Sequence, residues 1–143
     1  MSWQKRLKGE KIGNQFVGLP FNLIKSRAYS ELTGNAVKVL TLLMTHYNGH
    51  NNGFISFGLK DAGMHHTTAK RSLLDLQDKG FIKRTKAGFY KGNTSEWLLT
   101  FRKDDRNGHA KTDDWKKYPD NERNEEVNAL LLGKTSRKNS KKS

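Results

Sequence analysis

Residues 58–86 read GLKDAGMHHTTAKRSLLDLQDKGFIKRTK, and two glycines divide this run into segments. Gly63 follows a segment long enough for one helical turn, and Gly80 follows a longer helical segment, His66–Lys79. Glycine suits both positions because it readily adopts the left-handed conformation that ends many helices. We therefore expect two helices joined by a tight turn, then a strand over Ile82–Lys86.

The longer helix is predicted to have one apolar face and one basic face. Apolar residues recur at helical spacing and should point inward: Ala69, Leu73, Leu74 and Leu76. Met64 is expected to fill the space between the two helices. The candidate recognition residues are His65, His66, Thr67, Thr68, Lys70 and Arg71. Arginine and lysine donate to guanine or to phosphate, threonine offers a hydroxyl and a methyl group, and amides at a helix N-terminus attract phosphate.

Upstream, the chain predicts another helix and a short strand. Ser30 is a candidate helix cap, and apolar residues follow it at three- and four-residue spacing up to Asn48-Gly49, where the helix should end. Before this helix we expect an extended arm and a short turn of helix at Asn22 to Arg27. Phe54 to Phe57 should form a very short strand.

Downstream, a hairpin is expected to follow the basic helix. Ile82–Lys86 and Glu96–Phe101 have strand character, with Trp97, Leu99 and Phe101 alternating with Glu96, Leu98 and Thr100. The loop between the strands contains glycines that allow close approach to a phosphate or a narrow minor groove. We call this hairpin and its loop the wing, and its candidate contacts are Lys83, Arg84, Lys86, Lys91 and Asn93.

The order helix, short strand, helix, helix, strand, loop, strand predicts a mainly α fold with a small β-hairpin, a winged helix-turn-helix. We expect this domain to cover residues 16–101, after a flexible basic arm at 1–15. Residues 102–133 should form a polar extension with one further short helix at Val127–Leu132, and residues 134–143 a disordered basic tail.

Composition agrees with a nucleic-acid partner. The 143 residues contain 27 Lys+Arg against 14 Asp+Glu, a formal net charge of +13. Such an excess is relieved by a polyanion. An anionic membrane surface is the competing partner, but it would need an amphipathic anchor helix or a lipidation signal, and neither is evident. With no secretion signal or long apolar run, we expect a cytoplasmic, nucleoid-associated protein with no membrane partner.

Several motifs resemble a group of bacterial winged helix-turn-helix DNA-binding proteins common in alphaproteobacteria, their plasmids and phages. They are Phe16-Val17-x-Leu19-Pro20, Ser30-x-Leu32-x-x-Asn35-Ala36, Tyr47-Asn48-Gly49-x-Asn51-Asn52-Gly53, Leu76-x-x-x-Gly80-Phe81-Ile82, Gly88, Trp97-x-Leu99-Thr100 and Thr112-Asp113-Asp114-Trp115. The resemblance covers about residues 16–119 and implies DNA binding without naming a target. The paired His65-His66 departs from the pattern, so a sequence preference cannot be carried over.

Other chemistries find little support. The absence of cysteine excludes disulfides, thiolate catalysis and cysteine-ligated zinc. His46 and His50 have the spacing of two metal ligands, but Gly49 should break the helix between them. No catalytic constellation is present, so we expect neither an enzyme nor a cofactor. Trp97 and Phe101 are interpreted as core residues rather than base-stacking ones, and the roles of Trp3 and Trp115 are left open.

The leading hypothesis is a sequence-specific transcription regulator that binds double-stranded DNA, with repression of a mobile element as the favoured role. One winged helix reads few base pairs, so we expect a homodimer or a cooperative oligomer on DNA. The alternative is a plasmid replication or partition factor, or a nucleoid-type protein with little sequence preference. A third hypothesis is a protein-interaction adaptor that does not bind DNA.

Overall fold

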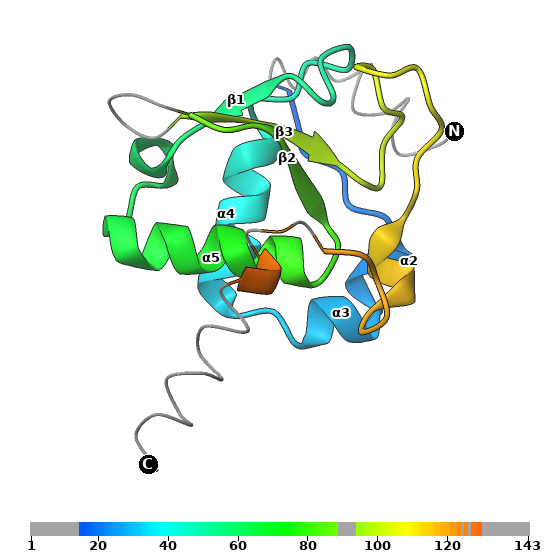
Figure 1. Ribbon diagram of the computed structural model, residues 1–143, viewed down its shortest axis with the longest axis horizontal. Helices are drawn as coiled ribbons and strands as arrows, with labels where there is room; N and C mark the ends of the chain where they lie inside the picture. The colour runs from blue at the N-terminus through cyan, green and yellow to red at the C-terminus, as the bar shows by residue number, and fades with distance from the viewer. Residues whose placement is uncertain (1–14, 89–93, 124, 126, 130–143) are drawn as a thin grey trace.

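Helices and one antiparallel sheet make up the computed structural model, which describes residues 15–88, 94–123, 125 and 127–129 (Figure 1). In chain order the elements are α2 (Phe21–Ile24), α3 (Arg27–Ser30), α4 (Gly34–Met44), β1 (Ile55–Phe57), the 3-10 helix η1 (Leu59–Ala62), α5 (His66–Asp78), β2 (Ile82–Lys86), β3 (Ser95–Leu99) and the 3-10 helix η2 (Asp114–Lys117). The predicted combination of helices with a small β-hairpin is confirmed. The short strand β1 joins the hairpin, so the sheet has three strands.

The sheet has the order β1-β3-β2, with both neighbouring pairs antiparallel. Ile55 of β1 lies opposite Trp97 of β3, and Ile82 of β2 lies opposite Leu99. The register between β2 and β3 shifts between Arg84 and Lys86. Such a bulge changes the direction of the side chains that follow it along β2.

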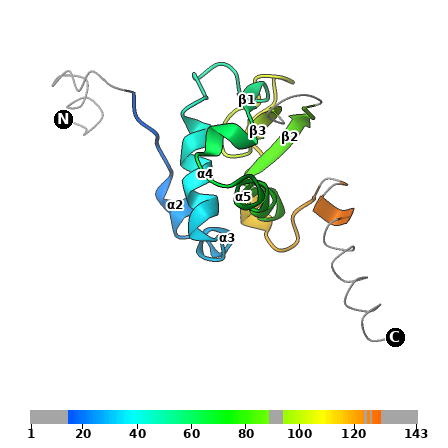
Figure 2. The ribbon, with the colours of Figure 1, turned by 90° about the vertical axis from the view of Figure 1, so that its left-hand side faces the viewer.

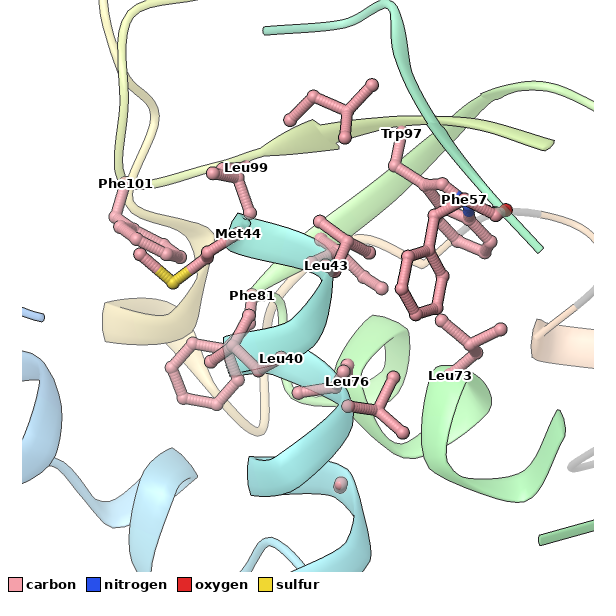
Figure 3. Packing of buried hydrophobic residues seen from close by; sticks show 14 of the residues in the cluster. Leu40, Leu43, Met44, Phe57, Leu73, Leu76, Phe81, Trp97, Leu99 and Phe101 are labelled. Carbon is pink, nitrogen blue, oxygen red and sulfur yellow. Dashed lines mark hydrogen bonds between the residues drawn. The ribbon is translucent and has the colours of Figure 1, made fainter. Parts of the chain in front are cut away.

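The core lies between α4, α5 and one face of the sheet (Figure 3). Leu40 and Leu43 of α4, with Leu76 of α5, are fully buried, as their helical spacing predicts. From the sheet side, Trp97 and Leu99 point toward these helices. The interpretation of Trp97 and Phe101 as core residues is confirmed, since both are almost fully buried.

The first long helix begins later and ends earlier than predicted. Thr33, not Ser30, is its N-cap, because the Thr33 side chain accepts a hydrogen bond from the Ala36 N–H at 3.1 Å. Ser30 instead ends α3, where its hydroxyl donates to the Arg27 carbonyl. The Thr33 N–H also donates to Asp75 of α5 at 3.0 Å, so a contact distant in sequence supports the local cap at the start of α4.

Two predictions about which side chains face inward are also corrected. Leu74 is only half-buried, whereas Ser72 is buried and donates to the Thr68 carbonyl. On β3 the alternation fails at its end, because Leu98 and Thr100 are buried as well as their neighbours. The chain returns over this end of the strand, and the N–H groups of residues 112 and 113 donate to the Thr100 carbonyl.

Packing continues beyond Phe101 into the segment predicted to be a polar extension. Trp115 is buried and its ring stacks on Phe81, with centroids 6.4 Å apart and planes at 12°. Arg123 pairs with Asp78 at the end of α5, with 2.6 Å between Nε and Oδ1. Val127 is buried too, whereas residues 130–132 of the predicted last helix lie outside the described residues. Trp115 is therefore a core residue.

Gly80, between α5 and β2, allows this segment to pack closely. A Cβ atom on Gly80 would lie 2.8 Å from the Asp114 carbonyl carbon, and its φ of +83° is left-handed. Gly49 has a similar φ of +93° but open space around the same position. We expect Gly80→Ala to lower the free energy of unfolding by about 2–4 kcal/mol and Gly49→Ala by about 1 kcal/mol, measured by urea denaturation. Equal losses would show that backbone strain alone matters at Gly80.

Candidate nucleic-acid interface

A tight turn links η1 to α5. Asp61 of η1 accepts a hydrogen bond from the Gly58 N–H at 2.8 Å, which holds the start of this short helix. Gly63 ends it in the left-handed conformation, with φ of +64°. Nδ1 of His65 then accepts from the Thr67 N–H at 3.2 Å and caps α5. The two predicted helical segments and the turn at Gly63 are therefore present, although the first is a single 3-10 turn.

The first turns of α5 expose most of the predicted contact residues. His65, His66 and Thr67 are exposed, as are Lys70 and Arg71. The two imidazole rings lie together, with centroids 4.4 Å apart. Thr68 is half-buried, on the flank of this face. We call the set His65, His66, Thr67, Lys70 and Arg71 the α5 face.

The predicted wing residues do not form one group. Lys83 turns toward the segment after β3 and pairs with the nearly buried Asp114, with 3.1 Å between Nζ and Oδ2. Lys86 lies 3.7 Å from Glu96 across the hairpin and stays largely exposed. Arg84 is half-buried, on the side of the sheet that faces α5. Lys91 and Asn93 lie outside the described residues.

The hairpin end and the α5 face lie on the same side of the molecule. In Figure 1 the start of α5, the helix η1 and the far end of β2 are all at the left, and Figure 2 views this side directly, with α5 end-on below the sheet. A small pocket of about 190 Å³ lies between them, lined by residues from η1, α5 and both strands of the hairpin. We call it the helix–hairpin pocket.

About half of the cations among the described residues form ion pairs. Acidic side chains pair with Arg27, Lys79, Lys83, Lys86, Arg106, Lys111, Lys116 and Arg123. Within the described part of the chain, Lys70 and Arg71 have no acidic partner, and neither has Lys60 of η1. Lys60 was not predicted as a contact, although its place in the short first helix was the signal that could have found it.

Lys79 shows the contrasting, structural use of a cation. Burial is the largest single influence on Lys79 and lowers its pKa, but the hydrogen bond to Asp75 together with the charges of Asp75 and Asp78 outweighs burial, so the pKa lies above its ordinary value. The same Asp75 carboxylate receives the Thr33 N–H. Lys79 therefore serves the contact between α4 and α5.

Comparison with known proteins adds no family to this description. No protein-family model, curated protein or solved structure matches the chain. The case for a function therefore rests on the residues themselves.

The two candidate metal ligands, His46 and His50, have different surroundings. Nδ1 of His46 lies 2.8 Å from the Ser56 carbonyl, and its ring packs edge-on against Phe57. His50 lies in the exposed turn beyond α4. Residues 15–88, 94–123, 125 and 127–129 hold no group of three or more side chains suited to a metal ion. The same residues include no helix long and apolar enough to cross a membrane.

Proposed function

We propose that this chain is a winged helix-turn-helix protein that binds double-stranded DNA. In this proposal η1 and α5 are the helix-turn-helix, the α5 face enters the major groove, and the β2–β3 hairpin is the wing. The position of α5 and the hairpin supports this proposal. Both lie on the same side of the molecule, so both would contact one duplex placed there. The motifs that resemble bacterial winged-helix proteins point in the same direction.

One observation carries the proposal: Lys70 and Arg71 lie next to each other on the exposed α5 face, and neither has an acidic partner among the described residues. Lys70 and Arg71 thus leave a concentrated positive charge exposed to solvent. Phosphates would neutralise this charge and release counterions, which favours binding at low salt. Arg71 also has the donors needed to read a guanine edge.

The role we favour is transcription regulation, as a repressor. Such a regulator needs more base contacts than one copy of the protein can make. We therefore propose two copies on a pseudo-palindromic site. Phe21 and Ile24 share one side of α2, and their exposed fractions of 82% and 39% provide apolar surface that a second copy would cover. Sedimentation of the protein with and without duplex measures the stoichiometry.

Selection of duplexes from a random pool tests the proposal. A regulator should yield a sharp, symmetric motif, and duplex binding should weaken steeply with salt. The basic segment 134–143, which holds no acidic residue, favours the alternative of a plasmid replication, partition or nucleoid-type protein. That alternative predicts binding without a motif. If no duplex binds even at low salt, both DNA roles fail and the protein-interaction adaptor remains.

Two alanine variants should separate base reading from phosphate contact. Arg71→Ala should cost about 1–3 kcal/mol of binding free energy and relax the preference at one position. Lys86→Ala, on the exposed side of the hairpin, should weaken all sequences alike and reduce the salt slope by about one. Fluorescence anisotropy on selected and scrambled duplexes measures both. Unchanged binding in both variants would mean that the helix and wing are misassigned.

A further inference from the structure

Exposed apolar side chains gather on residues 16–24, which include α2. Of the five large apolar side chains that are exposed among the described residues, four lie in this stretch. Phe21 is the most exposed of them, at 82%, and Val17 and Ile24 are exposed at 38% and 39%. No residue from 16 to 24 carries a charge. We call residues 16–24 the apolar patch.

A groove lies directly before Phe21 along the patch. Its volume is about 390 Å³, and its lining residues are 16–20 of the patch, Met44 at the end of α4, Tyr47 just beyond it, and Arg102. Met44 is almost fully buried, so it forms the floor of the groove. The knob at Phe21 and the groove are therefore adjacent parts of one surface.

The groove suits an aromatic ring. A cavity of about 150 Å³ accommodates benzene, so this groove has room for the phenyl ring of a phenylalanine. Arg102 is the charged side chain among the described residues that line it, and its Nη2 donates to the Gly18 carbonyl at 2.8 Å. This hydrogen bond holds residues 16–20 beside the end of β3 and keeps the groove in place.

We propose that a second copy of this chain docks on the apolar patch, with Phe21 of each copy in the groove of the other. Because knob and groove follow each other along one stretch of chain, two patches that run antiparallel satisfy both contacts by one two-fold axis. Charge favours the same surface. Each chain has a formal net charge of +13, so two copies repel each other where basic surfaces meet, and the uncharged patch offers contact without that cost.

This interface specifies how the two copies proposed on DNA would meet, and that part of the inference rests on the proposed function. In Figure 1, α2 lies at the right and the start of α5 at the left. A dimer formed through the apolar patch therefore leaves the α5 face of each copy uncovered. The dimer should also form without DNA, so the interface and the DNA-binding role can be tested separately.

Sedimentation equilibrium of the full chain without DNA tests the interface. We expect a dimer, and Phe21→Ser should weaken its association at least about tenfold, because a central aromatic anchor is lost. The fold should survive, since the ring is exposed in the single copy. Phe54→Ser is the matched control: its ring is 45% exposed, lies against the Arg106 guanidinium and is outside the patch, so association should not change.

Cross-linking tests which residues meet. The chain contains no cysteine, so cysteines introduced by mutation can pair only with each other. A mixture of Phe21→Cys and Val17→Cys chains should yield a disulfide-linked heterodimer, because Phe21 of one copy would lie at the partner's groove. A mixture of Phe21→Cys and Phe54→Cys chains should not.

Three results would overturn the proposal: a monomer at every concentration, a dimer that Phe21→Ser leaves intact, or equal cross-linking in the two mixtures. If the dimer forms as expected but no duplex binds, the proposed function fails and the interface stands. If duplex binds but the chain stays monomeric without DNA, the interface is wrong and the DNA-binding proposal stands.

Discussion

The double charge reversal Lys70→Glu/Arg71→Glu should reduce affinity for duplex DNA about a thousandfold, which corresponds to about 4 kcal/mol. Two exposed cations are lost, and two carboxylates are placed where phosphates would lie. The fold should survive, because neither side chain is buried or paired with an acid among the described residues. Anisotropy titrations at fixed low salt give the affinity, and circular dichroism reports the fold.

A matched control tests whether position or total charge is responsible. Lys116→Glu/Lys117→Glu changes the net charge by the same amount on η2, which lies far from the start of α5 in Figure 1. Affinity for duplex DNA should fall by less than about tenfold, because the new carboxylates repel the DNA only from a distance and salt screens this repulsion. If the two double variants lose equal affinity, the α5 face is not the DNA-binding surface.

Asn52→Ala should lower the free energy of unfolding by about 3–5 kcal/mol. The Asn52 side chain is fully buried, and its Nδ2 donates to the carbonyls of Leu99 and Lys103 at 2.9 and 2.8 Å. Its Oδ1 accepts from the Leu99 N–H at 2.6 Å. Alanine would leave these backbone groups without partners in a buried setting, which costs more than the hydrogen bonds themselves contribute.

Urea denaturation followed by tryptophan fluorescence measures this loss. Asn107→Ala is the matched control, because its exposed amide donates to Asp104, at 3.1 Å, and to no other described residue, and its loss should cost less than about 1 kcal/mol. If Asn52→Ala is no more destabilising than Asn107→Ala, water must satisfy the groups that Asn52 now holds.

The residues of the α5 face could be predicted from the sequence because their placement depends on local chemistry. Gly63 and Gly80 mark the ends of two helical segments, and the apolar spacing between them orients the helix. The same reasoning predicted that these side chains lie on the exposed face of the helix, and His65, His66, Thr67, Lys70 and Arg71 are exposed. The sequence could not show that Lys83 and Lys86 have different acidic partners. Only the fold brings Asp114 to Lys83 and Glu96 to Lys86.

Local signals therefore determined the helix from His66, the turn before it and the two hairpin strands, through caps, left-handed glycines and periodicity. The tertiary structure added to the local cap at the start of α4, because the Thr33 N–H donates to Asp75, 42 positions away. It also decided that Trp115 belongs to the core and that a small pocket lies between α5 and the hairpin. These features depend on contacts between segments that are distant in sequence. Local residue patterns do not indicate which distant side chains will come into contact.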